Sequence, residues 1–191
     1  MTALHKSLFA LSTIVLSLST GAARAGIGAT ATVSTTSTTS PYSYTITLDN
    51  TGTTNIGTLW FGWIPGYDFL SAAPTNISVP SGWTGFSDGP NFSGDGYSLE
   101  MYNLSGSAIA PGAIGTFSFK STASPAALEG AAQFLTQDPA TTSFVYIGFP
   151  EGDPGAQFTP TVVVPEPASL TLLSVGLLTT LRRRTRRPTI A

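Results

Sequence analysis

The chain has 191 residues, enough for one domain or for two small ones. It contains no cysteine, and its single histidine, His5, lies near the start. Catalysis by thiolate or imidazole groups, disulfide bonds and zinc sites built from His and Cys are therefore excluded for the body of the chain.

The net charge of −2 conceals an uneven distribution of charge along the sequence. Five of the eight basic residues lie at positions 182–187, whereas residues 26–164 contain one base, Lys120, against nine acids, a net charge of −8. A body this acidic repels polyanions, which argues against nucleic-acid binding.

The first 25 residues carry the three parts of a secretory signal peptide in the correct order. His5 and Lys6 form a weakly basic start, residues 8–18 form an apolar signal helix, and Ala23 and Ala25 provide the small positions of a signal-peptidase site. We expect cleavage after Ala25 and export of the body across the inner membrane. The alternative is the first hydrophobic helix of a cytoplasmic fold.

Residues 26–40 precede the first clear strand. Nine of the eleven residues at positions 30–40 are Ser or Thr, too polar a segment to bury much surface. We therefore expect residues 26–40 to form a linker or a weak edge strand. From Pro41 onward apolar and polar side chains alternate through Leu48, which predicts a strand with one buried face.

Residues 56–64 are apolar on both faces of an extended chain, as in a central strand buried from both sides. In such a strand Phe61 and Trp63 would point to one face and Trp60 to the other. Because Pro160 has no amide hydrogen, any strand that contains it belongs at the edge of a sheet. Further strands are expected at residues 75–79, 97–102, 113–120, 142–149 and 158–164. The alternation of apolar and polar side chains at 97–102 predicts a strand with one buried face.

The best helix candidate is residues 124–136, which are rich in Ala and Leu. Ser124 can cap the helix and Pro125 suits its first position. Gly130 weakens the middle of the segment, so we expect one short helix or a helical turn.

Short strands divided by Gly and Pro turns predict an all-β fold, an antiparallel Greek-key β-sandwich over residues 41–164. A jelly roll or a small barrel is the alternative. No repeat of fixed period is visible, which argues against a propeller or a solenoid.

Carboxylates are the remaining candidates for chemistry in the body. Asp88 with Asp95, or Glu100 with a neighbour, could form the acid and base of a glycoside hydrolase, although solvating surface charges explain these residues more simply. Asp88, Asn91 and Asp95 could also hold a structural calcium ion together with loop carbonyls. The same residues are common in ordinary turns.

The aromatic residues around position 60 support a glycan-binding hypothesis, since sugars stack on flat exposed rings. Trp60, Trp63 and Trp83 are the candidate contacts. Core filling explains each ring more simply, because a small sandwich without cysteine needs large apolar side chains.

The tail has three parts: Pro165-Glu166-Pro167, an apolar segment at residues 168–181, and the arginines Arg182, Arg183 and Arg184 with two more at 186 and 187. Apolar residues cover every side of a helix over 168–181, which argues against an amphipathic core helix. The segment has 14 residues, fewer than the roughly 18 expected of a permanent membrane helix. The arginines would stay on the cytoplasmic side.

In order, spacing and position these features resemble the PEP-CTERM sorting domain, which is also classified as an ice-binding-protein C-terminal domain without implying ice binding. The resemblance covers residues 165–187 and leaves 188–191 as an unexplained tail. It implies a substrate of exosortase, an inner-membrane processing enzyme of Gram-negative bacteria that produce exopolysaccharide. Pro165, Glu166 and Pro167 would be recognised, residues 168–181 would insert transiently as a transmembrane helix, and the tail would be removed.

We therefore expect an exported protein, processed by exosortase, with a structural or adhesive role at the cell surface or in the extracellular matrix. The expected partners are exosortase and, through a link to biofilm, exopolysaccharide. We expect no enzymatic activity, and no cofactor apart from the calcium candidate. A glycan-binding module is the first alternative and a carboxylate-dependent glycoside hydrolase the second.

Overall fold

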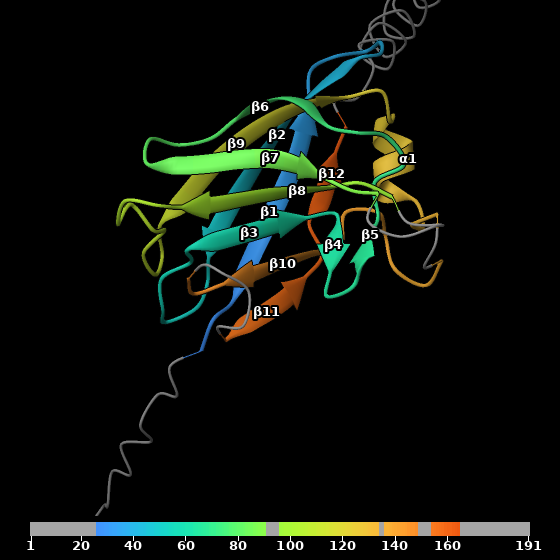
Figure 1. Ribbon diagram of the computed structural model, residues 1–191. Coiled ribbons are helices and arrows are strands. Elements are labelled where there is room, and N and C mark those ends of the chain that lie inside the picture. Colours follow the sequence, from blue (N-terminus) through green and yellow to red (C-terminus); the bar gives the residue numbers. More distant parts are fainter. Residues whose placement is uncertain (1–25, 91–95, 134–135, 149–153, 165–191) are drawn as a thin grey trace, which may run out of the picture.

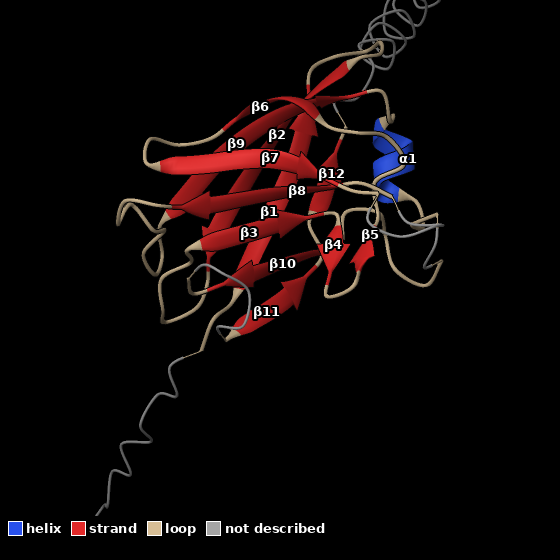
Figure 2. Ribbon diagram, in the orientation of Figure 1, coloured by secondary structure: helices blue, strands red, loops and turns tan. Residues whose placement is uncertain are grey.

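The computed structural model describes residues 26–90, 96–133, 136–148 and 154–164. These residues form two five-stranded sheets, a two-stranded hairpin and one short helix (Figure 1, Figure 2). The elements are, in chain order, β1 (Ala29–Thr35), β2 (Tyr42–Asn50), β3 (Thr58–Phe61), β4 (Trp63–Ile64), β5 (Tyr67–Asp68), β6 (Thr75–Ser78), β7 (Trp83–Asp88), β8 (Ser98–Asn103), β9 (Ile114–Ser121), α1 (Pro125–Glu129), β10 (Ser143–Tyr146), β11 (Gly155–Phe158) and β12 (Thr161–Val163).

The first sheet has the strand order β12-β1-β2-β9-β6, the second has the order β11-β10-β3-β8-β7, and β4 pairs with β5. All these pairs are antiparallel except that of β1 with β12, which is parallel. The two sheets enclose one main hydrophobic core. This arrangement confirms the predicted all-β sandwich.

The first sheet is built around β2, whose alternation follows the prediction. Tyr44, Ile46 and Leu48 are buried, while the residues between them are partly exposed. In the pairing of β2 with β9, Ile46 lies opposite Phe117 and Tyr44 lies opposite Phe119. One face of this pair therefore supplies a row of large core side chains.

The Ser/Thr-rich segment forms β1, so its assignment as a linker or a weak edge strand is wrong. β1 lies between β12 and β2 in the sheet. Ala31, Val33 and Thr35 point inward and are buried, while Thr30 and Thr32 are exposed. A half-buried strand needs an apolar or small side chain only at every second position, and threonine suits the extended chain. The sandwich therefore includes residues before Pro41.

The centre of the second sheet is β3, with all four side chains buried as predicted. The strand ends at Phe61, because Gly62 has a φ of 67° and breaks the extended conformation. Trp63 lies in β4 and stacks on Trp60, with 4.5 Å between the ring centroids. The prediction that these two rings point to opposite faces is wrong, since it assumed one continuous strand.

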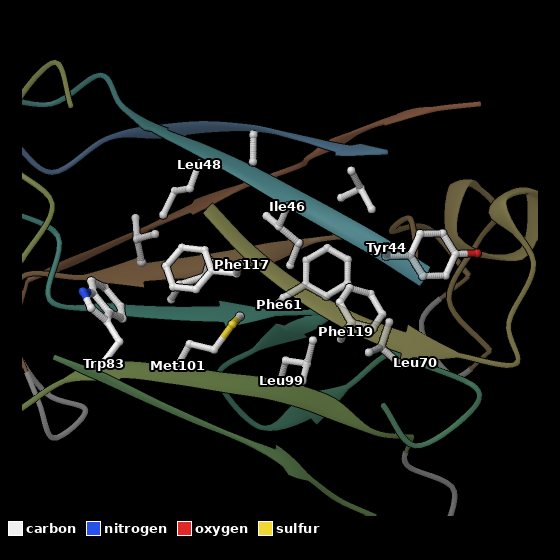
Figure 3. Packing of buried hydrophobic residues seen from close by; sticks show 14 of the residues in the cluster. Tyr44, Ile46, Leu48, Phe61, Leu70, Trp83, Leu99, Met101, Phe117 and Phe119 are labelled. Carbon is white, nitrogen blue, oxygen red and sulfur yellow. The ribbon is translucent and has the colours of Figure 1, made fainter. Parts of the chain in front are cut away.

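Aromatic rings from several strands meet in the core between the sheets (Figure 3). The Phe119 ring centroid lies 5.2 Å from that of Tyr44 and 5.4 Å from that of Phe61. Trp83 meets Phe117 edge-on at 5.2 Å. Residues from both sheets therefore interlock across the sandwich.

The predicted short helix is confirmed as α1. The Ser124 side chain accepts a hydrogen bond of 3.2 Å from the Ala127 amide, and Pro125 begins the helix. The helix ends before Gly130, and its buried Leu128 belongs to the main core. The short length agrees with a glycine placed early in an Ala-rich segment.

Residues 158–164, predicted as one strand, are divided by Pro160. β11 ends before this residue at the edge of the second sheet, and β12 follows it at the edge of the first. Because proline donates no amide hydrogen bond, it marks the crossing from one sheet to the other. The prediction of a position at a sheet edge is confirmed for both parts.

Tyr44 should make stability depend on alkaline pH. Its hydroxyl donates a 2.7 Å hydrogen bond to the Ala123 carbonyl, and its side chain is 1% exposed. Burial, and to a lesser degree the neighbouring Tyr42, raises the pKa of Tyr44 well above its usual value of 10.0. Above that pH the unfolded chain loses a proton that the folded protein keeps. Above pH 10 we therefore expect the ionisation of Tyr44 to lower the free energy of unfolding by up to about 1.4 kcal/mol per pH unit. Below pH 10 we expect no pH dependence from this group.

Tyr44→Phe should remove this alkaline loss and cost about 1 kcal/mol at pH 7, through the lost hydrogen bond. Urea titrations of the wild-type protein and the Tyr44→Phe variant, at pH 7 and above pH 10, measure the difference in their free energies of unfolding. An equal loss of stability in the two proteins at high pH would contradict the assignment to Tyr44.

Candidate functional site

The three tryptophans that were candidate glycan contacts are buried. Trp60, Trp63 and Trp83 are 3%, 6% and 7% exposed. Trp83 belongs to the main core, and its Nε1 donates a 2.9 Å hydrogen bond to the Ser107 carbonyl. The burial of the three rings agrees with core filling rather than with glycan contact.

Trp60 and Trp63 instead form a second hydrophobic cluster with Tyr146 and the partly buried Phe144. Trp60 points away from the main core, which receives its neighbours in β3. The Phe144 ring meets Trp63 edge-on at 6.1 Å and lies 4.8 Å from Tyr146. The second sheet is therefore apolar on both faces in this region.

A row of side chains that the sequence did not predict crosses the outer face of the second sheet. Phe86 of β7 lies opposite Glu100 of β8, Glu100 opposite Trp60, and Trp60 opposite Phe144. Phe86 is 40% exposed and meets Tyr102 edge-on at 6.0 Å. Only the pairing of four strands brings these residues together, so no local sequence signal could reveal the row.

The Glu100 side chain is 6% exposed, so its interpretation as a solvating surface charge is wrong. The alternation at residues 97–102 predicted one buried face, but Ser98, Leu99, Glu100 and Met101 are all buried. That prediction is wrong because the outer face of this sheet has an apolar cluster of its own.

The calcium candidates lie at the end of β7. The Asp88 carboxylate accepts a 2.8 Å hydrogen bond from the amide of the next residue, Gly89. Asn91 and Asp95 lie outside the described residues, so the calcium site and the Asp88–Asp95 carboxylate pair stay predictions. Within the described ranges, no group of three or more His, Cys, Asp or Glu side chains is arranged to hold a metal ion.

An open groove of about 510 Å³ lies where the β6–β7 turn meets the start of β9. Pro80, Trp83 and Ile109 line it together with Ile114, which is 64% exposed. None of its lining side chains is titratable. The groove can make apolar contacts but offers no acid–base chemistry.

The body reaches the sorting segment through β12. In the parallel pairing with β1, Thr161 lies opposite Thr32, Val162 opposite Val33, and Val163 opposite Ser34 (Figure 1). Val164, which follows β12, is 50% exposed. The Pro165-Glu166-Pro167 element, Arg182, Arg183 and Arg184, and the signal-peptidase positions Ala23 and Ala25 lie outside the described residues.

No helix in the described part of the chain has the length and hydropathy of a membrane span. The two predicted hydrophobic helices, at residues 8–18 and 168–181, fall outside this part.

Comparison with protein families identifies the PEP-CTERM protein-sorting motif at residues 163–187. This confirms the resemblance, and the match begins at Val163, the last residue of β12. It covers the sorting segment alone, and the family of the body is not identified. A search of curated proteins finds no match.

Proposed function

We propose that this protein is a structural or adhesive component of the cell surface or the extracellular matrix. The observation that carries the proposal is the PEP-CTERM motif, which supports an exported protein processed by exosortase. The proposed partner outside the cell is exopolysaccharide, because the resemblance implies a producing cell that makes it.

The body is consistent with a passive role of this kind. The sequence from 26 to 164 has neither histidine nor cysteine, and its net charge of −8, one base against nine acids, favours solubility over binding to anionic surfaces. Its aromatic side chains are mainly used in two clusters that hold the sandwich together. A cysteine-free domain stabilised in this way needs no disulfide after export.

Glycan binding stays the alternative, with its contacts moved to the outer face of the second sheet. Phe86 and Tyr102 flank Glu100 there and keep exposed surface, and Phe144 in the same row is partly exposed. An array that includes the producer's own polysaccharide separates the two roles. Binding of the wild-type protein to a glycan on the array, lost in the Phe86→Ala variant, would favour a glycan-binding module. Absence of binding to every glycan on the array would eliminate this alternative.

The sorting route is tested by Glu166→Ala in the full chain, expressed in a bacterium that has exosortase. We expect the precursor to accumulate in the inner membrane and the mature surface form to disappear. Glu129→Ala is the matched control, because this acid is exposed on α1 and lies outside the motif. Cell fractionation with immunoblotting measures both variants.

Mass spectrometry of the wild-type surface protein adds an independent check by reading its two ends. Peptides that span residues 167–182, recovered from material outside the cell, would contradict removal of the tail.

A further inference from the structure

The sorting motif and the folded body share residues. The motif begins at Val163, and Val163 is also the last residue of β12, paired with Ser34 of β1. Val164 alone separates this strand from Pro165. Two extended residue steps, about 7 Å, therefore join the sheet to the recognised element.

A distance of about 7 Å leaves little free peptide for a processing enzyme to bind before Pro165. Extended peptides are commonly bound as an added strand, through main-chain hydrogen bonds on both sides of the recognised residues. With β12 in place, the residues before Pro165 are held against β1 and the whole sandwich stands beside the binding cleft. The enzyme must either accept the folded body at this distance or take a longer peptide.

β12 is suited to leave the sheet. It has three residues, it lies at the sheet edge, and both Thr161 and Val163 are exposed. Val162 packs only partly buried against the core. Its release breaks one short ladder of hydrogen bonds with β1 and the contacts of β12 with α1, and uncovers the partly buried side chain of Val162.

The chain immediately before β12 is held much more firmly. Pro160 is buried, and its carbonyl accepts a 3.3 Å hydrogen bond from the Thr141 hydroxyl. β11 is paired with β10 over four positions, and Phe158 packs against the core. Opening should therefore stop at Pro160, which adds residues 161–163 to the free segment and extends its reach to Pro165 to about 17 Å.

We propose that β12 separates from β1 when the processing enzyme takes the sorting motif, with Pro160 as the hinge and residues 161–164 as part of the extended substrate. This inference rests on the exosortase route. It predicts that a precursor whose β12 cannot leave the sheet is not processed.

The experiment locks β12 to β1 with a disulfide in the full-length precursor. Thr32→Cys with Thr161→Cys joins two exposed positions that lie opposite each other. Neighbouring strands are about 4.8 Å apart, within the range of Cα separations that a disulfide spans. The chain has no cysteine of its own, so no competing disulfide can form within one molecule, and an exported protein meets an oxidising compartment.

Thr32→Cys with Thr47→Cys is the matched control, because this pair joins β1 to β2 and leaves β12 free. We expect the variant with the β1–β12 disulfide to accumulate as precursor and the control variant to be processed like the wild type. A reductant should restore processing of the disulfide-linked variant. A four-residue Gly-Ser insertion between Val164 and Pro165 should also restore it, since the insertion supplies about 13 Å of reach without opening the sheet.

Processing of the locked precursor at the wild-type rate, with the disulfide confirmed by mass spectrometry, would overturn the inference and leave the sorting route intact. Failure of the reductant to restore processing would also overturn it. A wild-type chain that is not processed in the same cells would refute the route itself.

Discussion

Gly62→Ala is expected to destabilise the sandwich by about 2 to 5 kcal/mol, the sum of about 1 to 2 kcal/mol for a left-handed backbone and about 1 to 3 kcal/mol for overpacking. Gly62 has a φ of 67°, which L-residues rarely adopt. An added Cβ would lie 2.6 Å from Leu70 Cγ and 3.2 Å from the Ala140 carbonyl oxygen. Leu70 is itself 1% exposed, so it has little room to move.

The stacked pair of tryptophans provides a second measurement for the same variant. Gly62 turns the chain so that Trp63 lies on Trp60 at 4.5 Å. If alanine pushes this turn toward an extended conformation, the two rings separate and the near-ultraviolet circular dichroism of the tryptophans should weaken. Urea titration gives the loss of stability independently.

Gly66→Ala is the control for the backbone term. Gly66 has a φ of 92°, and its added Cβ would meet no atom within 4 Å. The Gly66→Ala variant should lose only about 1 to 2 kcal/mol of stability, for the left-handed backbone, and should keep the circular dichroism signal of the tryptophans. Equal losses in the two variants would show that the contact with Leu70 is unimportant.

Gly62 also marks the limit of prediction from the sequence in this region. The apolar run at 56–64 correctly predicted a central buried strand, because burial from both sides leaves a continuous apolar pattern. The turn after Phe61 could not be read from that pattern, since a single glycine inside a strand is compatible with a bulge, a bend or no change. The relative positions of Trp60 and Trp63 depended on that one residue.

β1 shows a different limit. Its composition predicted a linker or at most a weak edge strand, yet the inward positions Ala31, Val33 and Thr35 are enough once β2 and β12 lie on either side. Composition averages over both faces of a strand, whereas burial depends on one face. By contrast, β2 was predicted well because its buried positions from Tyr44 to Leu48 are all large and apolar.

The sorting motif was readable because its recognised parts are contiguous in the chain. The row formed by Phe86, Glu100, Trp60 and Phe144 was not, because its residues come from four strands that are distant in sequence. The tryptophans were compatible with both core filling and glycan contact from their residue type, and their burial agrees with core filling. A linear signal can thus identify the route of this protein while its body stays without a family.

Phe61→Ala should cost about 3 to 5 kcal/mol, the usual loss when a fully buried phenylalanine is truncated. Phe61 is 0% exposed, belongs to the central strand of the second sheet, and contacts the Phe119 ring from the first sheet at 5.4 Å. Figure 3 shows it between Ile46 and Phe119, where both sheets would have to close on the space that its ring leaves. Because small domains have only about 5 to 15 kcal/mol of stability, urea titration should detect this loss as a large shift in the midpoint.

Phe86→Ala is the matched control, since it removes the same ring from a partly exposed position in an edge strand of the same sheet. We expect it to cost at most about 1.5 kcal/mol, mainly for the edge-on contact with Tyr102. The difference between the two variants measures how far stability depends on the space between the sheets rather than on aromatic content. If Phe86→Ala were as destabilising as Phe61→Ala, the packed part of the outer face would extend to β7, and Phe86 would be lost as a candidate for glycan binding.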